Sequence, residues 1–230
     1  HLRDGDPASN TLGWRWVAGI QTPGKNYVAR AGNIQKFTEG RFYPRGQLNE
    51  SPEPLQDDVR YACQPVAPAA AIDAGARSGL LLTGEDLAPE AGLPLTVSPV
   101  AVAAGWDQRL AERYRFSGTV ESFKRDAIDD GLARAAAHFG VGATALDSTG
   151  WEASAIAWAE AHELAQVIVP EPAIGPWQEV IDRLGAALHE RGITLVRVRR
   201  AWDDTLWPCA TRGFFQFRKH IKPSLELLLG

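Results

Sequence analysis

The residues whose types and spacing could do chemistry are concentrated in the opening stretch of the chain, HLRDGDPASNTLGWRW. Asp6 followed by Pro7 is typical of a helix start, because an Asp side chain accepts the free backbone amides and Pro suits the first turn. A helix that begins at Pro7 carries Asp6, Asn10 and Trp14 at positions i, i+4 and i+8, on one face. Such a face would offer a carboxylate, an amide and an indole to a flat ligand. The same spacing also fits a capped helix with two core tryptophans, since tryptophan is mostly buried in proteins.

Two longer stretches favour the ligand interpretation. HLRDGDPASNTLGWRWVAG resembles the flavin-binding segment of the photolyase/cryptochrome family, in which a His-Leu-x-Asp-Gly-Asp stretch leads through an Asn to Trp-x-Trp. YVARAGNIQKFTEGRF, at 27–42, is similar to the segment that follows these tryptophans in the family. The resemblance covers about the first 45 residues. It implies FAD as cofactor, damaged DNA as partner, and light-driven electron transfer that repairs pyrimidine dimers.

The resemblance also implies a role for each matching residue. Asp4 and Asp6 would face the polar edge of the flavin ring system, and Asn10 would lie near flavin N5 and stabilise its reduced form. Trp14 would be the nearest member of a chain that passes electrons to the photoexcited flavin. Trp16 would line the cavity that receives a flipped-out pyrimidine dimer, where an indole can stack on the bases. Hydrogen bonds and charges near N1 and N5 are the means by which proteins tune flavins, so these residue types suit the roles.

The chain starts at His1 and contains no Met. We therefore expect the C-terminal portion of a longer flavoprotein, whose upstream part completes the FAD pocket and the DNA-binding surface. Residues 1–45 would be the end of a helical FAD-binding domain, and the Pro-rich stretch 46–78 a linker. On this interpretation the parent chain is a DNA photolyase-type lyase, and the fragment alone is inactive.

Residues 79–230 alternate between strand-like and helix-like segments. Short apolar runs predict strands, which we place at 79–84, 95–104, 143–148, 165–170 and 193–199. Apolar residues at helical spacing predict helices, which we place at 120–139, 151–164 and 177–191, the last stopped by Gly192. Pro99 suggests that the second strand is an edge strand or carries a bulge. Strands separated by single helices predict an α/β fold with a doubly wound, mostly parallel sheet, preceded by the helical fragment of the FAD-binding domain.

This α/β part is also similar, more weakly, to the antenna domain of the same family, although that domain ordinarily precedes the flavin domain. No residue assigns an antenna chromophore, so that pigment stays unknown. The sequence holds neither GxGxxG nor GxxxxGK[ST], so a glycine-rich phosphate loop is not predicted. Asp147-Ser148-Thr149-Gly150 precedes a helix and could receive an anion, but a Ser or Thr that caps this helix is the preferred interpretation. His138, His162 and His189 fall in helices and do not indicate a catalytic triad.

The tail RAWDDTLWPCATRGFFQFRKH is dense in aromatic and basic residues. Three Phe residues alternate with three cations, namely Phe214, Phe215 and Phe217 with Arg212, Arg218 and Lys219. Such a pattern could stack on and neutralise a nucleic-acid strand. The preferred interpretation is a returning segment that packs its aromatic residues onto the sheet and leaves its charges in water.

Composition narrows the function classes. The formal net charge is -4, so any basic binding surface must be local. Cys63 and Cys209 lie far apart, which favours reduced thiols and predicts neither a disulfide framework nor a metal site. No apolar run is long enough for a membrane span and no signal peptide is evident, so we expect a cytoplasmic protein. Two alternatives to repair remain open: a cryptochrome-like blue-light photosensor, and a non-catalytic α/β module that binds a nucleotide or a partner.

Overall fold

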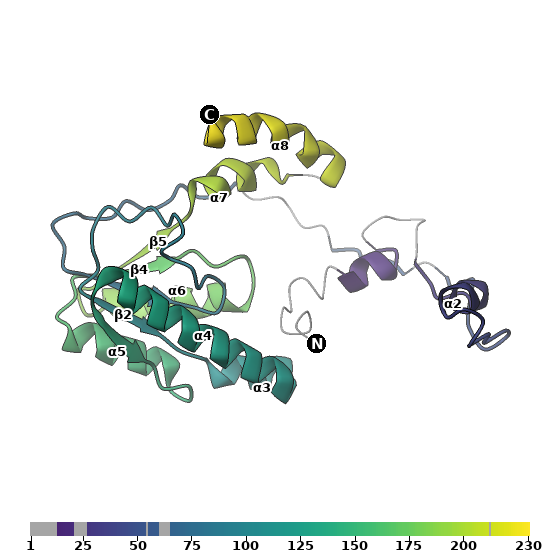
Figure 1. The fold of residues 1–230 in the computed structure, drawn as a ribbon, viewed down its shortest axis with the longest axis horizontal. Helices are drawn as coiled ribbons and strands as arrows, with labels where there is room; N and C mark the ends of the chain where they lie inside the picture. Colours follow the sequence, from purple (N-terminus) through teal and green to yellow (C-terminus); the bar gives the residue numbers. More distant parts are fainter. Residues whose placement is uncertain (1–12, 21–26, 54, 60–64, 212) are drawn as a thin grey trace. The chain divides into compact units, whose positions relative to one another are not determined.

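The computed structural model describes residues 13–20, 27–53, 55–59, 65–211 and 213–230 of the chain (Figure 1). These residues fall into two compact units, one drawn from Asp6–Ala62 and the other from Cys63–Gly230. The two units are described separately. The predicted domain boundaries, at 45 and 78, stay predictions.

Among its described residues, the first unit contains little regular structure. Residues 13–17 form a helical turn, after which Gly19 adopts a left-handed conformation with φ 79°. Helix α2 spans Ala31–Phe37, and its first amide, on Ala31, donates to Glu50 Oε1 at 2.7 Å. Glu50 thereby replaces the missing side-chain cap, because the first amides of a helix have no partner within it.

The second unit is built on a sheet of five parallel strands in the order β3-β2-β1-β4-β5. The strands are β1 Ser78–Leu82, β2 Ala101–Ala104, β3 Gly142–Ala145, β4 Gln166–Pro170 and β5 Thr194–Val198. All residues of β1, β2 and β4 are buried. Strands covered on both faces consist of continuous apolar runs, and this explains why the sequence signal for β1 and β4 is strong.

Helices cover both faces of the sheet (Figure 1). The helices of the second unit are α3 Gln108–Tyr114, α4 Gly118–Phe139, α5 Trp151–Ala161, α6 Pro176–His189, α7 Ala201–Leu206 and α8 Phe214–Leu229. α4 packs with Leu80 and Leu82 of β1, whereas α5 and α6 pack with Leu81. Successive residues of a strand point to opposite faces, so the two helix layers lie on opposite sides of the sheet. The prediction of a doubly wound parallel α/β fold is confirmed.

The residues at which α4 and α6 begin and end are explained by their local sequence. Ser117 Oγ accepts the amide of Val120 at the start of α4, and Gly140, with φ 66°, ends this helix. α6 begins with Pro176, which suits a first helical position, and ends at His189, two residues before the predicted end at 191.

None of the described helices is both long and apolar enough to cross a bilayer.

The structure corrects several element predictions. The second strand was predicted at 95–104, but the observed strand, β2, covers only Ala101–Ala104. It lies inside the sheet between β1 and β3. The prediction that Pro99 marks an edge strand or a bulge is therefore wrong, because Pro99 lies two residues before the strand. No helix occurs among the described residues 83–100, so β1 and β2 are not separated by a single helix as expected. Helices α3, α7 and α8 were not predicted.

The described residues before β1 are tied to the sheet by a buried amide side chain. Gln166, at the start of β4, is 1% exposed. Its Oε1 accepts the amide of Asp73 at 3.1 Å, and its Nε2 donates to Asp73 O and to Ser78 Oγ at 3.0 and 2.6 Å. At the opposite end of the strands, just after β5, Arg199 Nη2 donates to Ala67 O at 2.6 Å. The C-terminal part of the predicted linker thus lies on the α/β unit.

Candidate functional site

The predicted flavin residues are only partly covered by the structure. Asp4, Asp6 and Asn10 lie outside the described residues, so the predicted common face with Trp14 is not described. Trp14 and Trp16 are described, and their exposed fractions are 66% and 46%. Neither indole is part of a core in the described structure, and the alternative of two core tryptophans is wrong for them.

The helical turn at 13–17 directs the two indoles apart. Each residue of a helix turns by about 100°, so Trp14 and Trp16 leave the turn on opposite sides. The Trp16 ring packs against Tyr27, with ring centroids 6.1 Å apart and planes tilted by 54°. The Tyr27 amide also donates to Val17 O at 3.0 Å. Tyr27 begins the second of the two stretches that carry the family resemblance, so the described ends of these stretches are in contact.

An ion pair fixes the residue between the two tryptophans. Arg15 Nη1 lies 2.7 Å from Asp57 Oδ2. The hydrogen bond from Arg15, followed in strength by one from the Val59 amide at 2.9 Å, holds the pKa of the Asp57 carboxyl below its usual value. The predicted linker therefore returns to the Trp-x-Trp turn at Asp57.

A second candidate site lies at the carboxyl ends of β2 and β3. A cavity of about 170 Å³ opens there. It is lined by Ala104, Gly105, Trp106, Arg125, Ile128, Asp129, Ala145, Leu146 and Ser148. In open parallel sheets, ligands bind outside the carboxyl ends of the strands. The cavity therefore lies at the carboxyl edge of the sheet, although the switch point of this strand order falls between β1 and β4.

Trp106 is the most unusual residue of this cavity. It is 5% exposed, and its Nε1 is buried without a hydrogen-bond partner among the described residues. The Arg125 guanidinium lies 5.8 Å from the Trp106 ring centre, and Arg125 Nη2 donates to Gln108 Oε1 at 2.8 Å. Because an unpaired buried donor is costly, the Trp106 indole is a place where a ligand acceptor would be stabilising. The sequence reasoning missed this pair. Its one local signal is a Trp directly after a buried strand and a glycine.

The start of α5, next to this cavity, is not capped as expected. Gly150 occupies the N-cap position, with no side-chain hydrogen bond to the helix. Thr149 Oγ1 donates to the Asp147 carboxylate at 3.1 Å, and Ser154 Oγ accepts the Asp147 amide. The preferred interpretation, a Ser or Thr cap at 147–150, is therefore wrong. The Asp147 carboxylate also adds a negative charge where an anion would have to bind.

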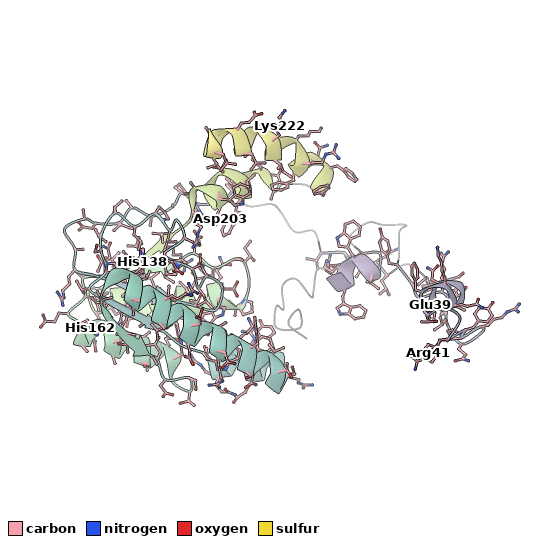
Figure 2. The ribbon with its side chains drawn as sticks, in the orientation of Figure 1. Glu39, Arg41, His138, His162, Asp203 and Lys222 are labelled. Carbon is pink, nitrogen blue, oxygen red and sulfur yellow. The ribbon has the colours of Figure 1, made fainter. Side chains whose placement is uncertain are left out.

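The three histidines His138, His162 and His189 do not form a catalytic group. Figure 2 shows His138 on α4 and His162 beyond the end of α5, on separate elements. His189 is the last residue of α6 and is exposed. Across the described part of the chain, no cluster of three or more His, Cys, Asp or Glu side chains could hold a metal ion.

The aromatic tail does not pack as expected. Phe214 and Phe215 begin α8 and are 61% and 78% exposed, while Phe217 is half-buried. α8 lies against α7 and not on the sheet (Figure 1). The preferred interpretation, in which the tail packs its aromatic residues onto the sheet, is wrong for Phe214 and Phe215. Arg212 lies outside the described residues.

Comparison with known proteins assigns no family. No protein-family model and no curated protein matches the chain. A solved structure described as the crystal structure of hypothetical protein PH0823 is similar to 54% of this chain and to 96% of its own chain. The two are 13% identical and superpose with a TM-score of 0.34. A likeness of this size carries no argument about function.

Proposed function

We propose that this chain is part of a photolyase-like flavoprotein that splits pyrimidine dimers in DNA by light-driven electron transfer from FAD. The observation that carries the proposal is the Trp-x-Trp turn, which combines the family-like motif with two indoles that are accessible in the structure. An exposed indole can stack on a flat aromatic ring, as the role of Trp16 requires, whereas an indole enclosed in a core cannot. The contact between Tyr27 and Trp16 gives further support, because it joins the two family-like stretches.

In this proposal each matching residue has a distinct task. FAD, when bound, supplies light absorption and the transferred electron. Asp4 and Asp6 would face the polar edge of its ring system, and Asn10 would lie near N5 and stabilise the reduced form. Trp14 would relay electrons, and Trp16 would stack on the flipped-out lesion. The partner would be damaged DNA. The proposed location is the cytoplasm, because two unclustered cysteines suit a reducing compartment.

The test of this function uses the purified full-length protein that contains this sequence. We expect a yellow protein with flavin absorbance, and we expect blue light to restore a dimer-containing oligonucleotide. A colourless preparation that stays colourless after incubation with FAD would contradict the proposal. A yellow protein that repairs no dimer would favour the cryptochrome-like photosensor, which shares the flavin but not the repair.

In the same experiment, Trp14→Phe is expected to slow flavin photoreduction by at least about tenfold, which needs only about 1.4 kcal/mol in the barrier. The physical reason is that a phenyl ring is much harder to oxidise than an indole. Trp202→Phe is the matched control, because Trp202 is 45% exposed and lies on α7 in the other unit. An unchanged rate in Trp14→Phe would remove Trp14 from the electron path.

The cavity beside Trp106 favours a second candidate function, a non-catalytic module that binds a nucleotide. Its volume of about 170 Å³ is close to that of a cavity that binds benzene, about 150 Å³, so it suits one six-membered ring. The unpaired Trp106 Nε1 could donate to a base carbonyl, and Arg125 could neutralise a phosphate.

This second candidate predicts that uridine monophosphate quenches tryptophan fluorescence on titration. Arg125→Ala should weaken the binding at least tenfold, because a hydrogen bond to a charged group contributes about 1.5–3 kcal/mol. Arg191→Ala, a change of similar size on the α6 side, should leave it unchanged. If millimolar uridine monophosphate causes no quenching, the cavity is not a nucleotide site.

A further inference from the structure

The first nine residues of α8 carry aromatic and basic side chains on the same exposed face. We call the set Phe214, Phe215, Arg218, Lys219 and Lys222 the aromatic–basic face. We propose that this face binds single-stranded nucleic acid, DNA or RNA, by stacking on bases and pairing with phosphates. The proposal is independent of the flavin function, since it uses no residue of the first unit.

Helix geometry places the five side chains together. At 100° per residue they lie within an arc of about 140°, in the order Phe214, Arg218, Lys222, Phe215, Lys219 around the helix. Phe214 and Arg218, like Arg218 and Lys222, are four residues apart and so about 6 Å apart along the axis. Each ring therefore lies one turn from a cation, which is the separation needed to contact a base and a neighbouring phosphate of one strand.

The buried side of α8 explains why this face stays exposed. The side chains that are at least partly buried lie in a neighbouring arc of about 100° that adjoins the aromatic–basic face at Phe214: Phe217, Ile221, Ser224, Leu225 and Leu228. α8 packs against α7, and Figure 2 shows Lys222 pointing away from α7, with Asp203 on the far side of that helix. The packing of α8 thus fixes the orientation of the aromatic–basic face toward solvent.

The two phenyl rings are open to a ligand. Phe214 and Phe215 are 61% and 78% exposed, and their rings meet edge to face with centroids 5.9 Å apart and an angle of 65°. Large exposed aromatic side chains on neighbouring positions lose hydrophobic stabilisation unless something covers them. A base has an aromatic face of its own, so it can stack on such a ring whatever its sequence identity.

The charges of the face match a polyanion. Three cations stand against one nearby carboxylate, Glu226, whose Oε1 lies 3.8 Å from Lys222 Nζ. The Lys222 side chain is 85% exposed, so this pair is weak and a phosphate can replace it. Lys219 Nζ donates to the neutral amide oxygen Gln216 Oε1 at 3.0 Å, a contact that brings no carboxylate to the face. The local excess of positive charge contrasts with the chain's net charge of -4.

The arrangement favours nucleic acid over a membrane surface. A helix that lies on a bilayer separates its apolar and charged residues onto opposite faces. On α8 the phenyl rings and the cations share one face, which is the pattern of proteins that hold single strands by stacking and by phosphate contacts. The proposal therefore commits to a single strand as the occupant.

The test is fluorescence anisotropy of the full-length protein with a labelled, lesion-free oligothymidylate and oligouridylate of twelve nucleotides, in the dark. Phe214→Ala and Phe215→Ala should each raise Kd by about five- to 150-fold, the range measured for base–aromatic stacking. The combined Arg218→Gln, Lys219→Gln and Lys222→Gln variant should make the slope of log K against log salt less steep by about 2. Flavin loss does not enter this readout, so failure here and failure of repair are distinguishable.

The matched control is Leu227→Ala, because Leu227 is 75% exposed on the same helix but lies outside the aromatic–basic face. It should leave Kd unchanged, and an equal loss in this variant would overturn the proposal. Wild-type protein that binds neither oligonucleotide overturns it as well. Binding of phosphatidylserine vesicles without oligonucleotide binding, lost in the Phe variants, would assign the face to a membrane instead. The expected result is oligonucleotide binding with no such vesicle binding.

Discussion

Gly79→Ala is expected to lower the free energy of unfolding of the α/β unit by about 3 kcal/mol, at the upper end of the cost of overpacking a core. Gly79 lies in β1 at the centre of the sheet. A Cβ atom at this position would lie 2.4 Å from Leu164 Cδ1 and 2.6 Å from Trp158 Cη2. Both neighbours are themselves buried, at 4% exposure each, so neither can move aside without disturbing the layer that covers the sheet.

Urea unfolding of the purified protein, followed by circular dichroism, measures this effect. Gly142→Ala is the matched control, because Gly142 also lies in a strand but no atom lies within 4 Å of an added Cβ. The control should be neutral or stabilising by less than about 1 kcal/mol, through its effect on the unfolded chain. Equal stabilities of the two variants would show that β1 is not packed as tightly as the structure indicates.

Trp151→Ala is expected to cost about 4 kcal/mol, as large-to-small changes of buried aromatic residues do. The Trp151 side chain is fully buried at the start of α5. Its ring meets Trp177 of α6 edge to face, with centroids 5.1 Å apart, and its Nε1 donates to Gly105 O at 3.0 Å. Removal of the indole leaves a cavity and also leaves a buried carbonyl without its donor.

Two further variants separate these contributions in the same unfolding experiment. Trp151→Phe keeps much of the packing but loses the hydrogen bond, so its cost should fall between those of wild type and Trp151→Ala. Trp202→Ala, at an exposed tryptophan of α7, should cost less than about 1 kcal/mol. A Trp202→Ala variant as unstable as Trp151→Ala would contradict the assignment of Trp151 to the core.

The elements that could be predicted from the sequence are those whose signal is local. β1 and β4 are continuous apolar runs, and α6 repeats Val180, Ile181, Leu184 and Leu188 at helical spacing on its buried face. α8 was missed because Pro223 inside it argues against a helix, although Phe217, Ile221, Leu225 and Leu228 repeat at helical spacing. The shortening of the second strand was missed because 95–100 is apolar in composition but forms no ladder with β1.

The strand order and the sites depend on contacts that a local pattern does not encode. Gln166 bonds Ser78 across 88 positions of sequence, and no periodicity indicates that pairing. The Trp106–Arg125 cavity likewise arises where a strand end and α4 meet. Of the predicted flavin residues, Trp14 and Trp16 are exposed, which suits the stacking role of Trp16, and the roles of both stay predictions. For Asp4, Asp6 and Asn10, the predicted flavin-binding roles rest only on the resemblance of the opening stretch to the photolyase/cryptochrome family.

The strand order also determines how long β1 remains without its partner strand while the chain is being synthesised. β1 lies in the middle of the sheet, yet its partner β4 follows about 88 residues later, as the Ser78–Gln166 pairing shows. At 5–20 residues per second, a ribosome needs about 4–18 s to make that interval. Throughout it the Leu80–Leu82 run, fully buried in the finished protein, lacks its β4 partner, and before β2 and α4 are made it has no partner on either edge or either face. The nascent chain is thus most prone to aggregation in this interval, and a chaperone that protects it would recognise SGLLL first.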